Sequence, residues 1–286
     1  MMRSFMCVRN LTMPARFAPL RWMRDGVLGL GLGLAAWTGA AQASAWPQPE
    51  GGGQVIISGA YNRLNVQGFD NLGRPSGTGS LQQFALQPYW EHGLTQRWTL
   101  GFSPRLQAAW MDQGAIRGSG YGLTEAAFFA RYAVWRGEGQ AFSVQAGVFT
   151  PGISSSAMPR VGERFASTEL RAAYGIGGEV GGLNMFASLQ AAYRLRFGSN
   201  ADEIRLDATV GARPFENWMV FVQSLNTIGM RNGRASGSDY DVYKLGLTVA
   251  YQINARNSIM LGYSRDIAGR RVALGDAVTL GWMYNY

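Results

Sequence analysis

The last stretch of the chain, residues 271–286, reads RVALGDAVTLGWMYNY. From Leu274 onward, bulky residues fall on every second position. One face of an extended chain would carry Val278, Leu280, Trp282, Tyr284 and Tyr286, and the other would carry Ala277, Thr279, Gly281, Met283 and Asn285. Because successive side chains of a strand point to opposite faces, this stretch predicts a β-strand with one apolar face.

The terminal strand also ends on an aromatic residue, Tyr286. It resembles the C-terminal signal of bacterial outer-membrane β-barrels, in which a final aromatic residue and alternating apolar residues are read by the barrel-insertion machinery. The resemblance implies that this machinery is a partner of the chain, acting through the C-terminal strand. A barrel further requires that strands of the same kind precede it.

Eleven further segments have the length and alternation of such strands. They span residues 54–65, 81–90, 97–111, 123–135, 141–149, 167–175, 183–196, 203–213, 218–228, 240–253 and 258–267. Alternation is cleanest over 183–196, where Phe186 is the one bulky exception, and it does not assign the faces of 54–65 and 218–228. Twelve is an even number, as a closed barrel with both ends on one side requires. The predicted fold class is all-β, a transmembrane antiparallel up-and-down β-barrel of about 12 strands after a cleaved signal peptide.

The connections between these segments favour an outer-membrane protein. Most odd-numbered connections are long and polar, whereas most even-numbered ones are short, as expected for extracellular loops and periplasmic turns. Aromatic residues predicted at the membrane interfaces are Trp90, Trp98, Trp110, Trp135, Trp218, Tyr251, Trp282, Tyr284 and Tyr286. Pro88 and Pro104 fall inside predicted strands; each removes one ladder hydrogen bond, so we expect a β-bulge there.

The N-terminal part of the sequence has the pattern of a secretory signal peptide over residues 1–43. Basic residues precede a short apolar run at 27–36, and Ala41-Gln42-Ala43 forms an A-x-A cleavage site. A transmembrane anchor is the alternative, but the apolar run is shorter than the roughly 20 residues that a spanning helix needs. We expect a signal peptide at 1–43, a periplasmic lead-in at 44–53, and an outer-membrane barrel at 54–286.

Composition argues against several other classes of protein. The full chain has 26 basic and 18 acidic residues and one cysteine, and its mean hydropathy is −0.07. Loss of five arginines and one aspartate with the signal peptide leaves 21 basic residues against 17 acidic ones. The remaining arginines are scattered, which argues against nucleic-acid binding. The mature chain has no cysteine and one histidine, so we expect no transition-metal site and no cofactor.

Two short segments carry a family resemblance. Residues 45–56 (AWPQPEGGGQVI) precede the first strand, and residues 91–101 (EHGLTQRWTLG) span the second turn. Both resemble a group of Gram-negative outer-membrane β-barrel proteins that are described as transporters or named after the phenol meta-cleavage (MetA) pathway. The resemblance implies one barrel over the whole mature chain and a transport role, and it supplies no catalytic residues.

The residues that alternation turns toward the lumen are charged. They are Glu91, Arg105, Glu125, Arg131, Glu169, Arg171, Arg194, Arg196, Glu203, Arg205, Asp207, Arg213 and Lys244. A lipid-facing Arg or Lys would cost about 2–4 kcal/mol near the bilayer midplane, so the lumen is the expected place for these side chains. No catalytic residue is predicted, because His92 lies in an expected periplasmic turn with no serine beside it.

Two functions use the same lumen residues. The charges either line a narrow passive channel and set its selectivity for small solutes, or pair across the lumen and plug a structural or loop-presenting barrel. A slight excess of arginine favours anionic solutes in the first case. A lipid-modifying enzyme is a third, weaker alternative. The expected location is the outer membrane, with its lipid and lipopolysaccharide as partners.

Overall fold

The computed structural model describes residues 45–65, 68–69, 75–76, 79–113, 116–156, 159–233 and 239–286. The predicted signal peptide lies outside these residues, so it remains a prediction, and so do the boundaries of the lead-in. Within the described ranges, no helix is long and apolar enough to cross a membrane.

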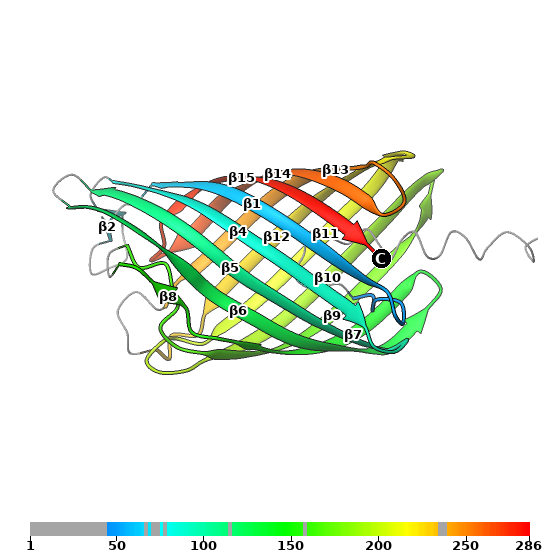
Figure 1. Ribbon diagram of the computed structural model, residues 1–286, viewed down its shortest axis with the longest axis horizontal. Helices are drawn as coiled ribbons and strands as arrows, with labels where there is room; N and C mark the ends of the chain where they lie inside the picture. Colours follow the sequence, from blue (N-terminus) through cyan, green and yellow to red (C-terminus); the bar gives the residue numbers. More distant parts are fainter. Residues whose placement is uncertain are drawn as a thin grey trace, which may run out of the picture.

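Twelve long strands of the described chain form one closed antiparallel barrel (Figure 1). Each strand pairs with its neighbours in sequence, and β15 pairs with β1 to close the barrel. The strands are β1 (Gly53–Asn65), β4 (Ser80–Gly93), β5 (Trp98–Gln113), β6 (Ile116–Gly137), β7 (Gln140–Phe149), β9 (Ser167–Val180), β10 (Leu183–Arg196), β11 (Glu203–Phe215), β12 (Trp218–Gly229), β13 (Asp241–Gln252), β14 (Asn257–Arg270) and β15 (Leu274–Asn285). The predicted all-β antiparallel barrel of about 12 strands is confirmed, and the cleaved signal peptide before it stays a prediction.

In the described part of the connections there are three short strands. β2 (Gly68–Phe69) pairs with β3 (Pro75–Ser76) in the first connection, and β8 (Ile153–Ser154) pairs with β6. β8 belongs to the long connection between β7 and β9, which therefore folds back onto the wall of the barrel. The backbone amides of Ser155 and Glu163 donate to the carbonyls of Tyr121 and Thr124 on β6 and hold it there.

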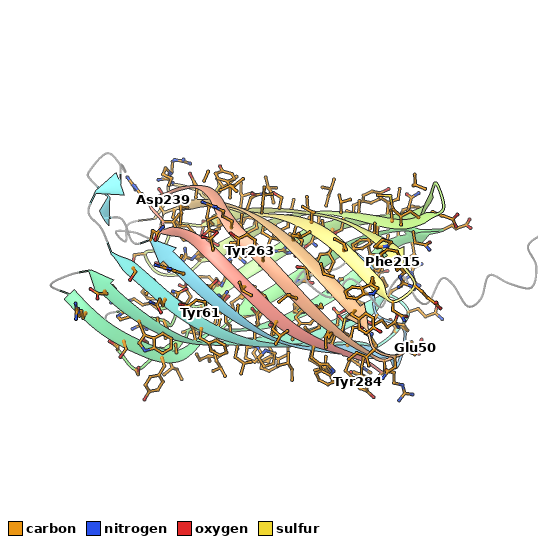
Figure 2. All side chains as sticks on the ribbon, turned by 90° about the horizontal axis from the view of Figure 1, so that it is seen from above. Glu50, Tyr61, Phe215, Asp239, Tyr263 and Tyr284 are labelled. Carbon is orange, nitrogen blue, oxygen red and sulfur yellow. The ribbon has the colours of Figure 1, made fainter. Side chains whose placement is uncertain are left out.

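The alternation of the sequence becomes the two faces of the barrel wall. On β15, Leu280 is 64% exposed on the outer face, whereas Met283 is fully buried inside. Figure 2 shows side chains projecting from the whole outer wall. Bulky apolar residues on the outer face are stable there because that face meets lipid hydrocarbon in a membrane.

The two ends of the barrel differ. At one end, here called the turn end, the strands are joined by short turns such as 138–139, 181–182 and 216–217. The other end, the loop end, carries the longer connections 66–79, 150–166 and 230–240. Glu50, Phe215 and Tyr284 lie at the turn end and Asp239 at the loop end (Figure 2).

Two connections are shorter than the sequence predicts. The predicted strands leave residues 112–122 and 176–182 as connections, but β5 and β6 are separated only by residues 114–115, and β9 runs to Val180. Glycine disfavours a strand only weakly when both neighbouring strands supply ladder partners, so pairing to adjacent strands outweighs the local signal here.

The two prolines inside strands lie opposite each other. Pairing of β4 with β5 lapses between Leu86↔Leu106 and Trp90↔Phe102 without a change of register, which sets Pro88 against Pro104. The Ser103 hydroxyl donates to the Pro88 carbonyl at 3.1 Å within this gap. The expected bulge is therefore absent at Pro88, but a register shift lies next to Pro104, in the β5–β6 ladder between Arg105 and Leu106.

Candidate functional site

The lead-in peptide enters the lumen at the turn end. Ala45 and Gln48 are buried, and Trp46 packs with Ala141 and Ala173 on the inner wall. The backbone N–H of Gln48 donates to Thr99 Oγ1 at 3.0 Å. A Cβ on Gly175 would overlap the Trp46 ring, so glycine at this position makes room for the indole. Residues 45–48 therefore fill part of the lumen at the turn end, and the exposed Pro49 and Glu50 lead to β1.

A buried ion pair anchors the lead-in. Arg131 Nη2 lies 2.9 Å from Glu91 Oε2, and neither side chain is more than 2% exposed. Arg131 Nη1 donates to the Trp46 carbonyl at 3.1 Å, and Gln48 Nε2 donates to Glu91. The Tyr89 hydroxyl also donates to Glu91 at 2.7 Å. This pair, expected to line a pore or to plug it, thus holds a peptide in the lumen.

Next to the ion pair lies an apolar layer that the sequence analysis did not predict. It consists of Ile56, Tyr89, Phe129, Met219, Phe221, Ala250, Met260 and Met283, with Phe186 packed against them. The sequence analysis placed Met283 on the face opposite the apolar one of the last strand, but it did not predict that such residues join into a layer. The sequence feature that could have indicated this layer was Phe186, the one bulky apolar residue on the inner face of its strand. The inner face of β12 was unassigned because Met219 and Phe221 point inward, while Ser224 and Asn226 face outward on the same strand.

Toward the loop end, a network of ion pairs lies along the inner wall over the neighbouring strands β9, β10 and β11. Arg171 Nε lies 2.8 Å from Glu169, and its Nη1 lies 2.7 Å from Asp207 on β11. Arg205 contacts Glu203 at 3.0 Å and Glu169 at 3.8 Å. Each carboxylate is therefore held by at least one guanidinium, as buried charges require.

A second set of ion pairs lies closer to the loop end. Arg194 pairs with Glu125 on β6, and its guanidinium carbon lies 3.9 Å from the centroid of the Phe149 ring. Arg196 contacts Glu203 at 2.8 Å and Glu163 of the β7–β9 connection at 3.1 Å. This connection is therefore tied to the inner rim of β10.

Three predicted lumen residues stand apart from these networks. Arg105 faces Glu125 across the β5–β6 ladder, but its buried Nε has no hydrogen-bond partner. Lys244 lies 3.5 Å from Asp266. Arg213 is half-buried on β11 near the turn end and is paired in register with Asn184.

A cavity of about 410 Å³ remains open on one side of the lumen. Its charged lining consists of Arg105, Arg171, Arg205, Asp207 and Lys244. The wall formed by β1 and β13 to β15 contributes Lys244 and otherwise small residues, among them Ser58, Gly246, Thr248, Gly262, Thr279 and Gly281. Ile56, Tyr89 and Met260 of the apolar layer border the cavity on the side of the turn end.

The loop connecting β10 and β11 is held by Asp202. The Arg196 amide donates to Asp202 Oδ1 at 2.8 Å, while Asn232 and the Tyr193 hydroxyl donate to Oδ2 at 2.7 and 2.8 Å. Burial opposes ionisation of this carboxyl, but the hydrogen bonds outweigh burial and lower the pKa of Asp202 below its ordinary value.

On the outer wall at the turn end, aromatic rings bridge the barrel closure. The Trp90 indole donates to the Tyr286 hydroxyl at 2.8 Å, and the His92 ring stacks on the rings of Trp90 and Tyr286. His92 belongs to β4 and not to the following turn, so its expected position is wrong by a few residues. Of the predicted interface aromatics, Trp90, Trp98, Trp110, Trp135, Trp218, Trp282 and Tyr286 are exposed, while Tyr251 and Tyr284 are half-buried beside Trp218 and Trp282.

Residues 51–282 of the chain match the family described as "Putative MetA-pathway of phenol degradation". The chain belongs to this family. The match covers the barrel from the end of the lead-in to β15 and confirms the resemblance seen in residues 45–56 and 91–101. No sequence among the curated proteins gives a significant match.

Solved structures share the fold. An outer membrane channel from Pseudomonas putida F1 superposes with a TM-score of 0.65 and 15% identity, covering 85% of this chain and 98% of that chain. The transport unit of the autotransporter AIDA-I from Escherichia coli gives a TM-score of 0.50 and 10% identity, covering 89% and 96%. At these identities the likeness supports the fold alone, an outer-membrane β-barrel. In such barrels the short turns face the periplasm and the long loops face outward.

Proposed function

We propose that this family member is a narrow passive channel for small solutes across the outer membrane. The observation that carries the proposal is the cavity of about 410 Å³, because it leaves one side of the lumen unfilled beside the ion pairs. Polar and charged side chains that border a pore set which solutes pass. Arg105, Arg171, Arg205, Asp207 and Lys244 would take this role.

The lead-in is the closed gate of this channel. Residues 45–50 lie across the periplasmic mouth, and the polar contacts of Gln48 and Trp46 with Glu91, Thr99 and Arg131 hold them. All of these contacts are hydrogen bonds to one short peptide. Release of the lead-in would break these hydrogen bonds and the isolated bridge between Glu50 and Gly93, while the twelve long strands stay paired with one another.

Single-channel conductance in planar bilayers tests the proposal. We expect small steps from the full barrel, larger steps after deletion of residues 45–50, and smaller steps for Thr248→Phe, which places a ring in the cavity. Folding of each variant is checked by its migration on gels before and after heating. Folded protein that gives no steps across a range of salts, with and without the lead-in, would overturn the channel.

The alternative is a plugged structural or loop-presenting barrel. The buried pairs Arg131–Glu91 and Arg171–Asp207 favour it, because they fill the other side of the lumen. The same conductance traces decide between the two functions. A lipid-modifying enzyme has less support: His92 points outward and contacts Trp90 and Tyr286 rather than a nucleophile.

A further inference from the structure

The cavity in the lumen has an uneven charge. Four of the residues that border it are cationic, Arg105, Arg171, Arg205 and Lys244, and one is anionic, Asp207. Arg171 and Arg205 are held by carboxylates, and Lys244 is near Asp266. These pairings fix the side chains and cancel much of their charge.

Arg105 differs from the other three cations. Glu125, the residue opposite it in the β5–β6 ladder, is ion-paired with Arg194. The Nε of Arg105 is buried and has no hydrogen-bond partner. A buried N–H without an acceptor is unfavourable. Arg105 also borders the cavity, so a small rotation of its guanidinium would bring this N–H to a ligand oxygen.

The other borders of the cavity add shape and polarity. Ile56 and Met260 supply an apolar floor, and Tyr89 adds an aromatic side chain. A volume of about 410 Å³ lies within the roughly 300–1,000 Å³ of small-molecule pockets. Guanidinium groups bind carboxylates through paired hydrogen bonds, whereas apolar floors favour hydrocarbon.

We propose that this cavity is a binding site for a small organic monocarboxylate with an apolar body. The carboxylate accepts hydrogen bonds from Arg105, and the apolar body rests on Ile56 and Met260. The ligand class deepens the proposed channel function and rests on it for its physiological meaning. Binding itself requires only the folded barrel.

The test is calorimetric titration of the full barrel in detergent with benzoate. We expect saturable binding, at least about tenfold weaker in Arg105→Gln because charge-assisted hydrogen bonds are lost. Arg63→Gln is the matched control: it removes the same charge from an exposed residue of β1, and benzoate affinity should stay within about twofold. Benzamide, which lacks the charge, and acetate, which lacks the apolar body, should each bind at least about tenfold more weakly than benzoate.

Several outcomes would overturn the site. One is equal benzoate affinity in Arg105→Gln and Arg63→Gln; another is equal affinity for benzoate and benzamide, which would indicate apolar partition only. If Arg105→Gln does not fold, Thr248→Phe serves as a second test, because its ring narrows the cavity from β13. Thr248→Phe should weaken benzoate binding at least about tenfold. Unchanged benzoate binding in this variant would overturn the site. Conductance without benzoate binding would contradict the site and leave the channel, whereas binding without conductance would contradict the channel and leave the site.

Discussion

The two sides of the lumen differ in how they are filled. On the side of β4 to β11, long side chains reach across neighbouring strands and pair, as Arg171 does with Asp207 over Gln190. On the side of β12 to β15 and β1, the inward positions are often small, such as Gly246, Gly262 and Gly281, and a cavity remains. Both sides belong to the same twelve-stranded wall. The difference shows that strand number sets the width of the lumen, whereas side-chain size and pairing decide how much of it is open.

The largest expected effect lies on the filled side. Arg131→Met removes the fully buried partner of Glu91 and leaves a carboxylate uncompensated in the lumen. Breaking a buried pair from one side costs about 3–5 kcal/mol of the free energy of unfolding. The loss in the free energy of unfolding is measured by urea titration, with tryptophan fluorescence as the signal.

The matched control for this ion pair is an exposed one. Arg265 and Asp276 lie 3.7 Å apart on the outer wall, with side chains 68% and 46% exposed. Arg265→Met should cost at most about 1 kcal/mol. If Arg131→Met and Arg265→Met lower the free energy of unfolding equally, the contrast between a filled lumen and a solvent-accessible surface is contradicted.

A pair of glycine substitutions compares the two sides directly. A Cβ at Gly101 on β5 would overlap the Phe129 ring, whereas a Cβ at Gly246 on β13 would meet its nearest neighbour, Ser264 Cβ, at 3.5 Å. Gly101→Ala should therefore cost about 1–3 kcal/mol through overpacking. Gly246→Ala should change the free energy of unfolding by at most about 0.5 kcal/mol. The same urea titrations measure the free energy of unfolding of both variants. If Gly246→Ala lowers it as much as Gly101→Ala does, the open side is also tightly packed.

The smallest expected effect concerns pH at the rim of the filled side. Because the pKa of Asp202 is lowered in the folded loop, its contribution to stability is present above the ordinary aspartate pKa of about 3.9 and is lost as pH falls through the lowered value. Asp202→Asn should reduce stability at neutral pH by about 1 kcal/mol, the net value of a hydrogen bond.

Thermal unfolding midpoints of wild type and Asp202→Asn, measured from pH 7 to pH 2, test this expectation. The two curves should converge at the acid end, because the wild-type carboxyl is then protonated as well. A gap of constant size over the whole range would show that ionisation of Asp202 does not stabilise the loop.

The strand pattern could be predicted from the sequence because each strand has one face in lipid. Alternation over 183–196 gives the bounds of β10 without error, and the terminal residues from Val278 to Tyr286 lie on the faces expected for β15. Prediction failed where local signals were weak against pairing, as at the glycines 177 and 178 in β9. It also failed on β12, where apolar residues occupy both faces.

The candidate site was only partly predictable. The alternation of residues along each strand identifies the side chains that point inward. It does not show which of them meet, because partners such as Arg194 and Glu125 lie on strands separated by two others. The lead-in was expected to lie in the periplasm, and no periodicity marks it as a peptide that enters the lumen. Its place depends on Glu91, Arg131 and the space above Gly175.

The sequence by itself determined the class of fold, the number of strands and the face of most side chains. These follow from a local rule, since neighbouring residues of a strand must point to opposite sides and only one side meets lipid. The tertiary structure alone decided the layers of the lumen: the inserted lead-in, the apolar layer at Phe129 and Phe186, the ion pairs and the cavity beside Arg105. Those depend on closure of the barrel, because β1 meets β15 and distant inward residues come together only when the sheet joins its own edge.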